Sequence, residues 1–119
     1  MTAKEWICGS LSAMTLALSP QLALAQQIPA EIQKGKTVFE QNCAVCHGVA
    51  GDVGGVNTKE MSPVPSNFTD PAFWKGKTDA LLYRTILNGS SREMPGYRDL
   101  LTPQEIRDVL EYIKTFRKS

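Results

Sequence analysis

Hydrophobic residues recur at helical spacing in three stretches of the chain, which glycine- and proline-rich connections separate. The first predicted helix begins near Pro29, a favourable residue in a first turn, and runs towards Cys43. Ile32, Gly35 and Phe39 fall on one of its sides. A glycine inside a helix costs about 1 kcal/mol relative to alanine. A close crossing with another helix is one reason to keep Gly35 there.

The second predicted helix follows Thr78, whose side chain can cap it, and has Asp79 in its first turn. The pair Asn88-Gly89 supplies its stop. The face that we expect this helix to bury consists of Leu81, Leu82, Thr85 and Ile86.

The third predicted helix has the clearest ends. Thr102 is placed to cap it, Pro103 takes the first helical position, and Glu105 completes a capping box. Its apolar positions at helical spacing are Ile106, Val109, Leu110, Ile113 and Phe116. The positions that we expect to face mostly water are Glu105, Arg107, Asp108, Glu111 and Lys114. Three helices without a strand predict an all-α domain.

A long connection, from Gly48 to about Lys77, separates the first two helices. Such a stretch is unusual in a compact domain unless it carries function or wraps a ligand. The pattern therefore indicates that a bound group supplies part of the interior.

The first 25 residues are typical of a secretory signal peptide. Lys4 gives a weakly positive start, an apolar stretch follows from Trp6 to Leu18, and Ala23-Leu24-Ala25 offers a cleavage site. Cleavage after about Ala25 would leave one domain, residues 26–119, in the periplasm; an uncleaved anchor is the alternative. The chain has 13 basic and 12 acidic residues. It has no basic stripe with interleaved aromatic residues, which argues against a nucleic-acid partner.

The pentapeptide Cys43-Ala44-Val45-Cys46-His47 carries the candidate chemistry. C-x-x-C-H is the attachment sequence of c-type haem: each thiol can bond one vinyl group, and the adjacent imidazole can ligate the iron. A thioredoxin-like dithiol is one alternative, although it needs a βαβ context that the neighbouring sequence lacks. Structural zinc is another, although the mature chain offers only three Cys or His residues where four ligands are usual.

The sixth position of such an iron needs a second ligand. The chain has one histidine, so two imidazoles from this chain are impossible. Met61 and Met94 are the thioethers that remain after signal removal. Met94 precedes Pro95, which holds the backbone extended at Met94, and this favours Met94. Ordinary packing remains an alternative role for either methionine.

From Ile28 to Lys118 the chain resembles the small class I cytochromes c. In that family a glycine and an aromatic residue precede the haem motif, as Gly35 and Phe39 do here. A glycine-rich turn follows the motif, as in residues 48–55, and a Met-Pro loop matches residues 94–97. The pair Tyr112-Ile113 matches the family's last helix, which packs across the first. The resemblance implies a cytochrome c fold around one covalent haem c.

The resemblance also suggests further contacts in the haem pocket. In the family a proline carbonyl often accepts the N–H of the proximal imidazole, and Pro63 or Pro65 could do so here. Trp74, Tyr97 and Arg84 are candidates for contacts with the haem propionates.

His47 and Met94 together would leave the iron no open position, which predicts an electron carrier or a cytochrome subunit rather than an enzyme. Its partners would be redox proteins that dock transiently, such as a dehydrogenase as donor and an oxidase or another cytochrome as acceptor. Two alternatives remain at this point. One is a haem-based gas or redox sensor with a labile sixth ligand, and the other is a thiol–disulfide oxidoreductase using Cys43 and Cys46.

Overall fold

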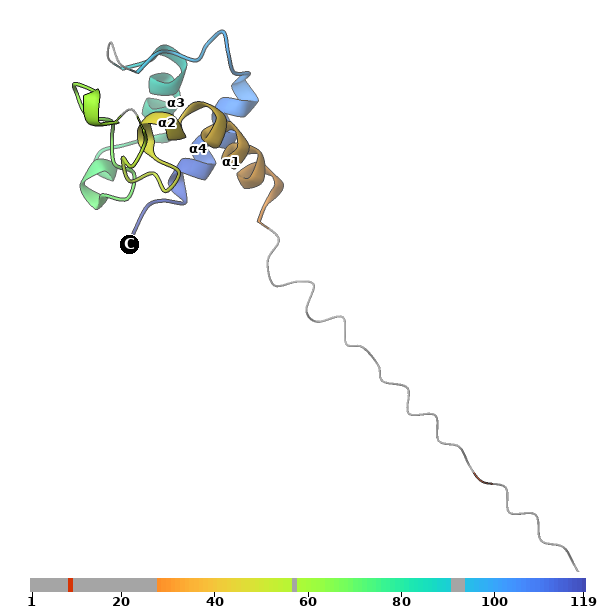
Figure 1. Cartoon of the computed structure of the whole chain (residues 1–119). Helices are drawn as coiled ribbons and strands as arrows, with labels where there is room; N and C mark the ends of the chain where they lie inside the picture. The colour runs from red at the N-terminus through yellow and green to blue at the C-terminus, as the bar shows by residue number, and fades with distance from the viewer. Residues whose placement is uncertain (1–8, 10–27, 57, 91–93) are drawn as a thin grey trace, which may run out of the picture.

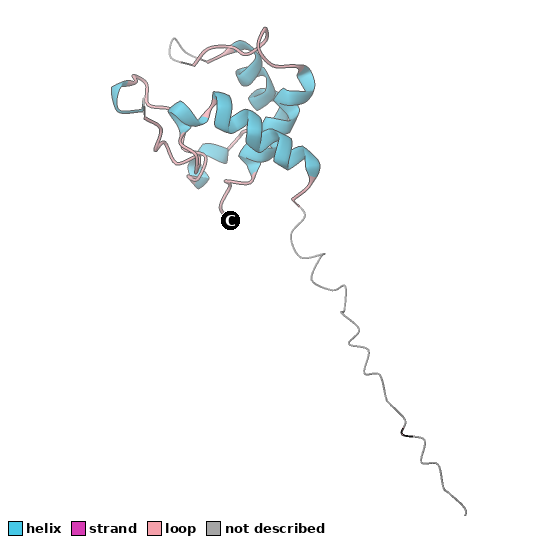
Figure 2. Ribbon diagram, turned by 45° about the vertical axis from the view of Figure 1, so that its right-hand side comes forward, coloured by secondary structure: helices cyan, strands magenta, loops and turns pink. Residues whose placement is uncertain are grey.

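The protein is described by a computed structural model that places residue 9 and residues 28–56, 58–90 and 94–119. Apart from Gly9, the predicted signal peptide lies outside the described residues. Within the described part of the chain the regular elements are all helical, which confirms the all-α prediction (Figures 1 and 2). The elements are α1 (Ala30–Asn42), α2 (Ala44–His47), η2 (Thr58–Glu60), η3 (Pro71–Trp74), α3 (Asp79–Asn88) and α4 (Pro103–Lys114).

Helices α1 and α4 cross in close contact at the centre of the fold (Figure 1). Gly35 lies at this crossing, and a methyl group added to it would overlap the carbonyl oxygen of Asp108. The sequence-based expectation of a close crossing at Gly35 is therefore confirmed. Around the crossing, Phe39, Ile106 and Val109 are completely buried, so the core begins where the two helices meet.

Helix α4 has the ends that its sequence predicts, with one exception in its polar face. Thr102 accepts from the backbone N–H of Glu105, and the Glu105 carboxylate accepts from the backbone N–H of Thr102. The expectation that Asp108 faces water is wrong, because it is 3% exposed. Burial is tolerated because the Gln104 amide donates to its carboxylate at 2.7 Å. The helix ends at Lys114, so Phe116 packs on the core from beyond it.

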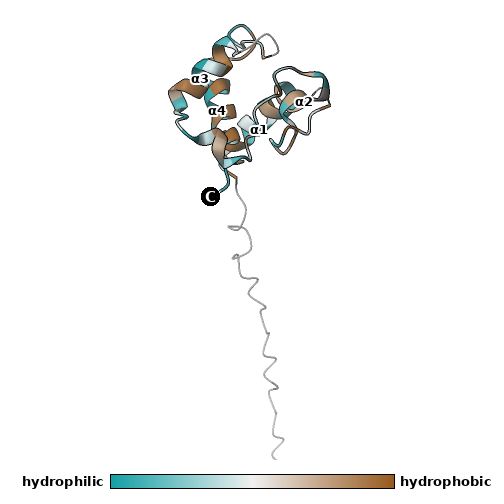
Figure 3. Cartoon of the chain, turned by 90° about the vertical axis from the view of Figure 1, so that its left-hand side faces the viewer, coloured by the Kyte–Doolittle hydropathy of each residue, from teal (hydrophilic) through white to brown (hydrophobic). Residues whose placement is uncertain are grey.

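Helix α3 is capped by Thr78, whose hydroxyl accepts from the N–H of Leu81 at 3.1 Å, and it stops at Gly89 with φ +78°. Of its predicted apolar face, Ile86 is buried, but Leu81 remains 37% exposed. Only part of the predicted apolar face of α3 is therefore buried in the protein core. Figure 3 shows hydrophobic stretches on both α3 and α4. Leu81, Leu82 and Ile86 of α3 line the cavity described below, as do Leu110 and Ile113 of α4.

The connection between the first two predicted helices is more ordered than the sequence indicated. It contains the short turns η2 and η3, and Asp70 caps η3 by accepting from the N–H of Ala72 at 2.9 Å. Phe68 is buried at 7% exposure against the ring of Phe39, which anchors the connection to α1. No helix formed by the described residues is long and apolar enough to cross a lipid bilayer.

Candidate functional site

The C-x-x-C-H pentapeptide forms the short helix α2, which the following loop holds in place. The hydroxyl of Thr58 donates to the carbonyl oxygen of Cys46 at 2.6 Å. Gly55 packs so closely on α2 that a methyl group there would overlap the carbonyl oxygen of Val45. Helix α2 then ends at Gly48, whose φ of +80° favours glycine. The loop therefore fixes the orientation from which both cysteines and His47 project.

His47 is buried and held by two contacts. Its Nδ1 lies 3.0 Å from the carbonyl oxygen of Ser66, and because a carbonyl can only accept, Nδ1 must be the donor. Its ring stacks on that of Phe68, with centroids 4.5 Å apart. Burial lowers the pKa of His47, with the hydrogen bond to Ser66 acting in the opposite direction. A neutral imidazole with Nδ1 protonated presents Nε2 as a lone-pair ligand, the form that binds a metal.

This geometry corrects one expectation of the sequence analysis. Pro63 and Pro65 both line the hollow beside His47, but neither carbonyl accepts its N–H; Ser66 provides the acceptor instead. Any residue can offer a backbone carbonyl, so no side-chain pattern could have identified Ser66 in advance.

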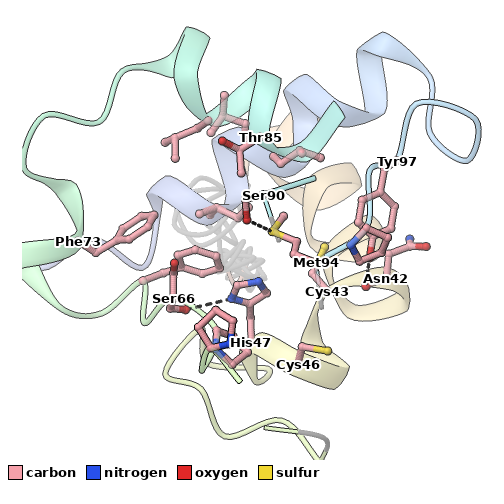
Figure 4. A pocket seen from close by; sticks show the side chains of 18 of the residues that line it. Asn42, Cys43, Cys46, His47, Ser66, Phe73, Thr85, Ser90, Met94 and Tyr97 are labelled. Carbon is pink, nitrogen blue, oxygen red and sulfur yellow. Dashed lines mark hydrogen bonds between the residues drawn. The ribbon is translucent and has the colours of Figure 1, made fainter. Parts of the chain in front are cut away.

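A cavity of about 560 Å³ opens in front of His47 (Figure 4). This volume falls within the range of about 300–1,000 Å³ that is typical of small-molecule and cofactor sites. Its lining brings together Cys43, Cys46, His47, Met61 and Met94, although these residues come from separate segments. Apolar side chains complete it, among them Leu81, Leu82, Ile86, Leu110 and Ile113.

The lining has the chemistry that a covalent haem requires. Two thiols and a neutral imidazole border one hollow, an arrangement that suits two thioether bonds and one iron ligand. The rest of the wall is largely apolar, as the faces of a porphyrin need. Leu81 and Leu82 of α3 thus border the cavity. This explains why Leu81 is 37% exposed although its helical spacing predicted burial. The residues present fit haem c.

The Cys43 thiol does not resemble that of a dithiol catalyst. Burial, followed by the charge of Cys46, raises the pKa of Cys43 to about 12. Catalytic and redox-active cysteines generally have lowered pKa values, since the thiolate is the nucleophile.

The two methionines predicted as possible sixth ligands both line the cavity. The Ser90 hydroxyl donates to the Met94 sulfur at 3.5 Å (Figure 4). Ser90 thus belongs to the site, although nothing in its sequence context distinguished it from other polar loop residues.

Of the three residues expected near haem propionates, one borders the cavity. Tyr97 lines it, and burial followed by the charges of Cys43 and Cys46 raises the pKa of its phenol. Trp74 does not line it: its indole N–H donates to the carbonyl oxygen of Phe68 at 2.9 Å inside the core. Arg84 is exposed on α3 and is likewise absent from the lining. The single indole N–H of Trp74 is thus already used by Phe68, which argues against a propionate contact there, whereas a propionate contact of Arg84 stays a prediction.

Comparison with known proteins agrees with this site. Residues 30–113 match the family described as "Cytochrome C oxidase, cbb3-type, subunit III". The chain therefore belongs to this family of c-type cytochromes, which bind haem and serve electron transport.

Individual relatives extend the comparison. A "Cytochrome c-553-like" protein of Synechocystis is 24% identical over 81% of this chain and 79% of its own length. The "Cbb3-type cytochrome c oxidase subunit FixP" of Bradyrhizobium diazoefficiens is 34% identical over 67% of this chain. The chain spans only 26% of FixP, so the likeness concerns one part of that larger subunit.

A solved structure supports the fold. The "KustC0563 c-type cytochrome" superposes with a TM-score of 0.61 at 25% identity, covering 71% of this chain and 98% of its own. The all-α arrangement seen here is therefore the cytochrome c fold, as the resemblance implied.

Proposed function

We propose that this protein is a periplasmic electron carrier with one covalent haem c, bonded through Cys43 and Cys46 and ligated by His47 and Met94. The observation that carries the proposal is the single cavity on which these four side chains converge. The bound haem would supply one-electron exchange between Fe(III) and Fe(II). The contributions of the protein are attachment, orientation and exclusion of water.

Each side chain has a distinct part in this proposal. Ser66 and Phe68 fix the tautomer and the ring orientation of His47. Met94 would add a neutral, soft donor, which favours the reduced state and raises the reduction potential. Met61 lines the same cavity and is the alternative sixth ligand. The backbone conformation that Pro95 imposes on Met94 supports Met94 over Met61.

The location and the partners belong to the same proposal. Residues 1–25 would direct export and be removed after about Ala25, which leaves residues 26–119 as a mono-haem domain without a membrane span. Its partners would be redox proteins, with a dehydrogenase as donor and an oxidase or another cytochrome as acceptor. Docking would be brief, over interfaces below about 1,200 Å². The likeness to part of FixP also makes a cytochrome subunit of an oxidase complex a reasonable setting.

Purification from cells with a working haem-ligation system tests the proposal. We expect a coloured protein whose haem stays attached on a denaturing gel and whose mass exceeds that of residues 26–119 by one haem. Replacing both Cys43 and Cys46 by alanine should leave the haem non-covalent or absent. Colourless protein with both thiols open to alkylation would end the proposal. Rapid binding of carbon monoxide to the reduced wild type would instead favour a sensor with a labile sixth ligand.

A further inference from the structure

Tyr97 joins two parts of the site that are distant in sequence. Its hydroxyl donates to the carbonyl oxygen of Asn42 at 3.0 Å, across 55 residues. Asn42 is the last residue of α1 and directly precedes Cys43. Tyr97 follows Met94 by three residues. Figure 4 shows Tyr97 and Met94 on the same side of the cavity as Asn42 and Cys43. One hydrogen bond therefore ties the Met94 loop to the haem-attachment end of α1.

Backbone contacts hold the same loop against α3. The N–H of Tyr97 donates to the carbonyl oxygen of Ile86 at 2.9 Å. Gly96 lies so close to the end of α3 that a Cβ atom there would be 2.7 Å from the carbonyl carbon of Asn88. The loop after Met94 is thus held to α3 by backbone hydrogen bonds from Tyr97 and Arg98, and to α1 by the Tyr97 hydroxyl.

The bond to Asn42 uses the single proton of the Tyr97 phenol. Carbonyl groups at the end of a helix lack partners within the helix, and a side-chain donor can satisfy them. The phenol cannot then donate to a haem propionate at the same time. The two hydrogen bonds that Tyr97 donates indicate that it holds together the segments of the protein that surround the cavity.

We infer that Tyr97 is a positioning residue that holds the Met94 loop to the attachment end of α1 and so opposes dissociation of the Met94 sulfur from iron. The inference rests on the proposed ligation by Met94. When the sulfur leaves, the loop must move, and the Tyr97–Asn42 bond is weakened with it. One hydrogen bond of this kind typically changes an equilibrium by about fivefold.

The test uses Tyr97→Phe in the oxidised holoprotein, which keeps the ring and removes the donor. Imidazole binds the iron in place of the methionine, so its affinity reports how readily the sulfur leaves. We expect Tyr97→Phe to bind imidazole about fivefold more tightly than the wild type. Tyr83→Phe is the matched control, because Tyr83 lies on α3 and does not line the cavity. Its imidazole affinity should remain unchanged.

A purely structural role predicts a different result. Tyr97→Phe would then unfold at lower urea concentration while its imidazole affinity equals that of Tyr83→Phe, and the inference would be overturned. The ligation itself is checked separately through the sulfur-to-iron charge-transfer absorption of the oxidised protein. If Met94→Ala retains this absorption, the proposed ligation by Met94 fails. If Met94→Ala loses it and Tyr97→Phe leaves imidazole binding unchanged, only the inference fails.

If Tyr97→Phe does not fold with haem attached, a measurement on the wild type tests the same inference. Coupling between two equilibria is reciprocal, so displacement of Met94 must weaken the Tyr97–Asn42 bond by the same factor. In the reduced protein, carbon monoxide at high concentration should displace Met94 slowly, and NMR can then follow exchange of the Tyr97 hydroxyl proton. We expect this exchange to become about fivefold faster. Unchanged exchange would overturn the inference.

Discussion

Gly35 of α1 lies directly against the main chain of Asp108 in α4. A Cβ atom at Gly35 would be 2.5 Å from the carbonyl carbon of Asp108 and 2.9 Å from the Cβ of Tyr112. The two helices approach so closely because no side chain separates them. The same helix α1 ends at Asn42 and leads through Cys43 directly into the attachment helix α2.

Gly35→Ala should therefore destabilise the holoprotein, although alanine is the better helix former. Overpacking of this kind costs about 1–3 kcal/mol, whereas the gain in helix propensity is about 1 kcal/mol. Because the overlap is with backbone atoms of Asp108, we expect a cost near the upper end of that range and so a net loss of about 2 kcal/mol, measured by urea unfolding. Lys34→Ala, at an exposed position of the same helix, is the control and should stay within about 0.5 kcal/mol of the wild type. Equal stability of the two variants would contradict the close crossing.

Met94→Ala should lower the reduction potential and open the sixth position. Loss of the thioether removes a ligand that favours the reduced state, so the reduction potential should fall by on the order of 100 mV. A change of this size lies within the wide range over which axial ligands alter the reduction potential of haem. Carbon monoxide should then bind the reduced protein rapidly. Met61→Ala is the matched control, because Met61 lines the same cavity. If Met61→Ala shows these changes and Met94→Ala does not, Met61 is the ligand.

Ser90→Ala should lower the potential by a smaller amount. The Ser90 hydroxyl donates to the Met94 sulfur at 3.5 Å, which draws electron density away from the sulfur, weakens its donation to the iron and so favours the reduced state further. A threefold change in the electron-exchange equilibrium corresponds to about 30 mV for one electron. Spectroelectrochemistry can resolve such a shift. Ser90→Thr keeps the hydroxyl and should retain the wild-type potential, and a potential unaffected by either change would remove Ser90 from the site.

Glu105→Gln should lower stability in a pH-dependent way. Hydrogen bonds from the Thr102 backbone, and then from its side chain, lower the pKa of the Glu105 carboxyl. Because the folded pKa is lowered, the stabilisation is present above the ordinary pKa of 4.5 and is lost as the pH falls through the folded value.

The difference in urea midpoint between wild type and Glu105→Gln should therefore be present at pH 7 and shrink as the pH falls below 4.5 and through the lowered folded pKa. Glu60→Gln, at an exposed position of η2, provides the control and should show no such difference. A difference for Glu105→Gln that does not change with pH would contradict the capping role of the carboxylate.

Features that depend only on neighbouring residues could be predicted before the fold was known. Thr78, Thr102 and Glu105 occupy the capping positions assigned to them, because caps and helical periodicity follow from local backbone geometry. The five residues of the haem-attachment motif are consecutive, so their chemistry can be inferred from the sequence without knowledge of the fold. Gly35 was informative for a related reason: its cost within a helix pointed to a compensating contact elsewhere.

Contacts between groups that are distant in the sequence became known from the fold. The Ser66 carbonyl, rather than one from Pro63 or Pro65, accepts from His47, and the Tyr97 hydroxyl reaches Asn42. These partners depend on how the long connection and the Met94 loop close in space. Helical spacing likewise identified the apolar face of α3, but only the fold revealed that a cavity lies against it. The number of residues between two such groups does not determine how far apart they lie in space, so the sequence alone could not identify these contacts.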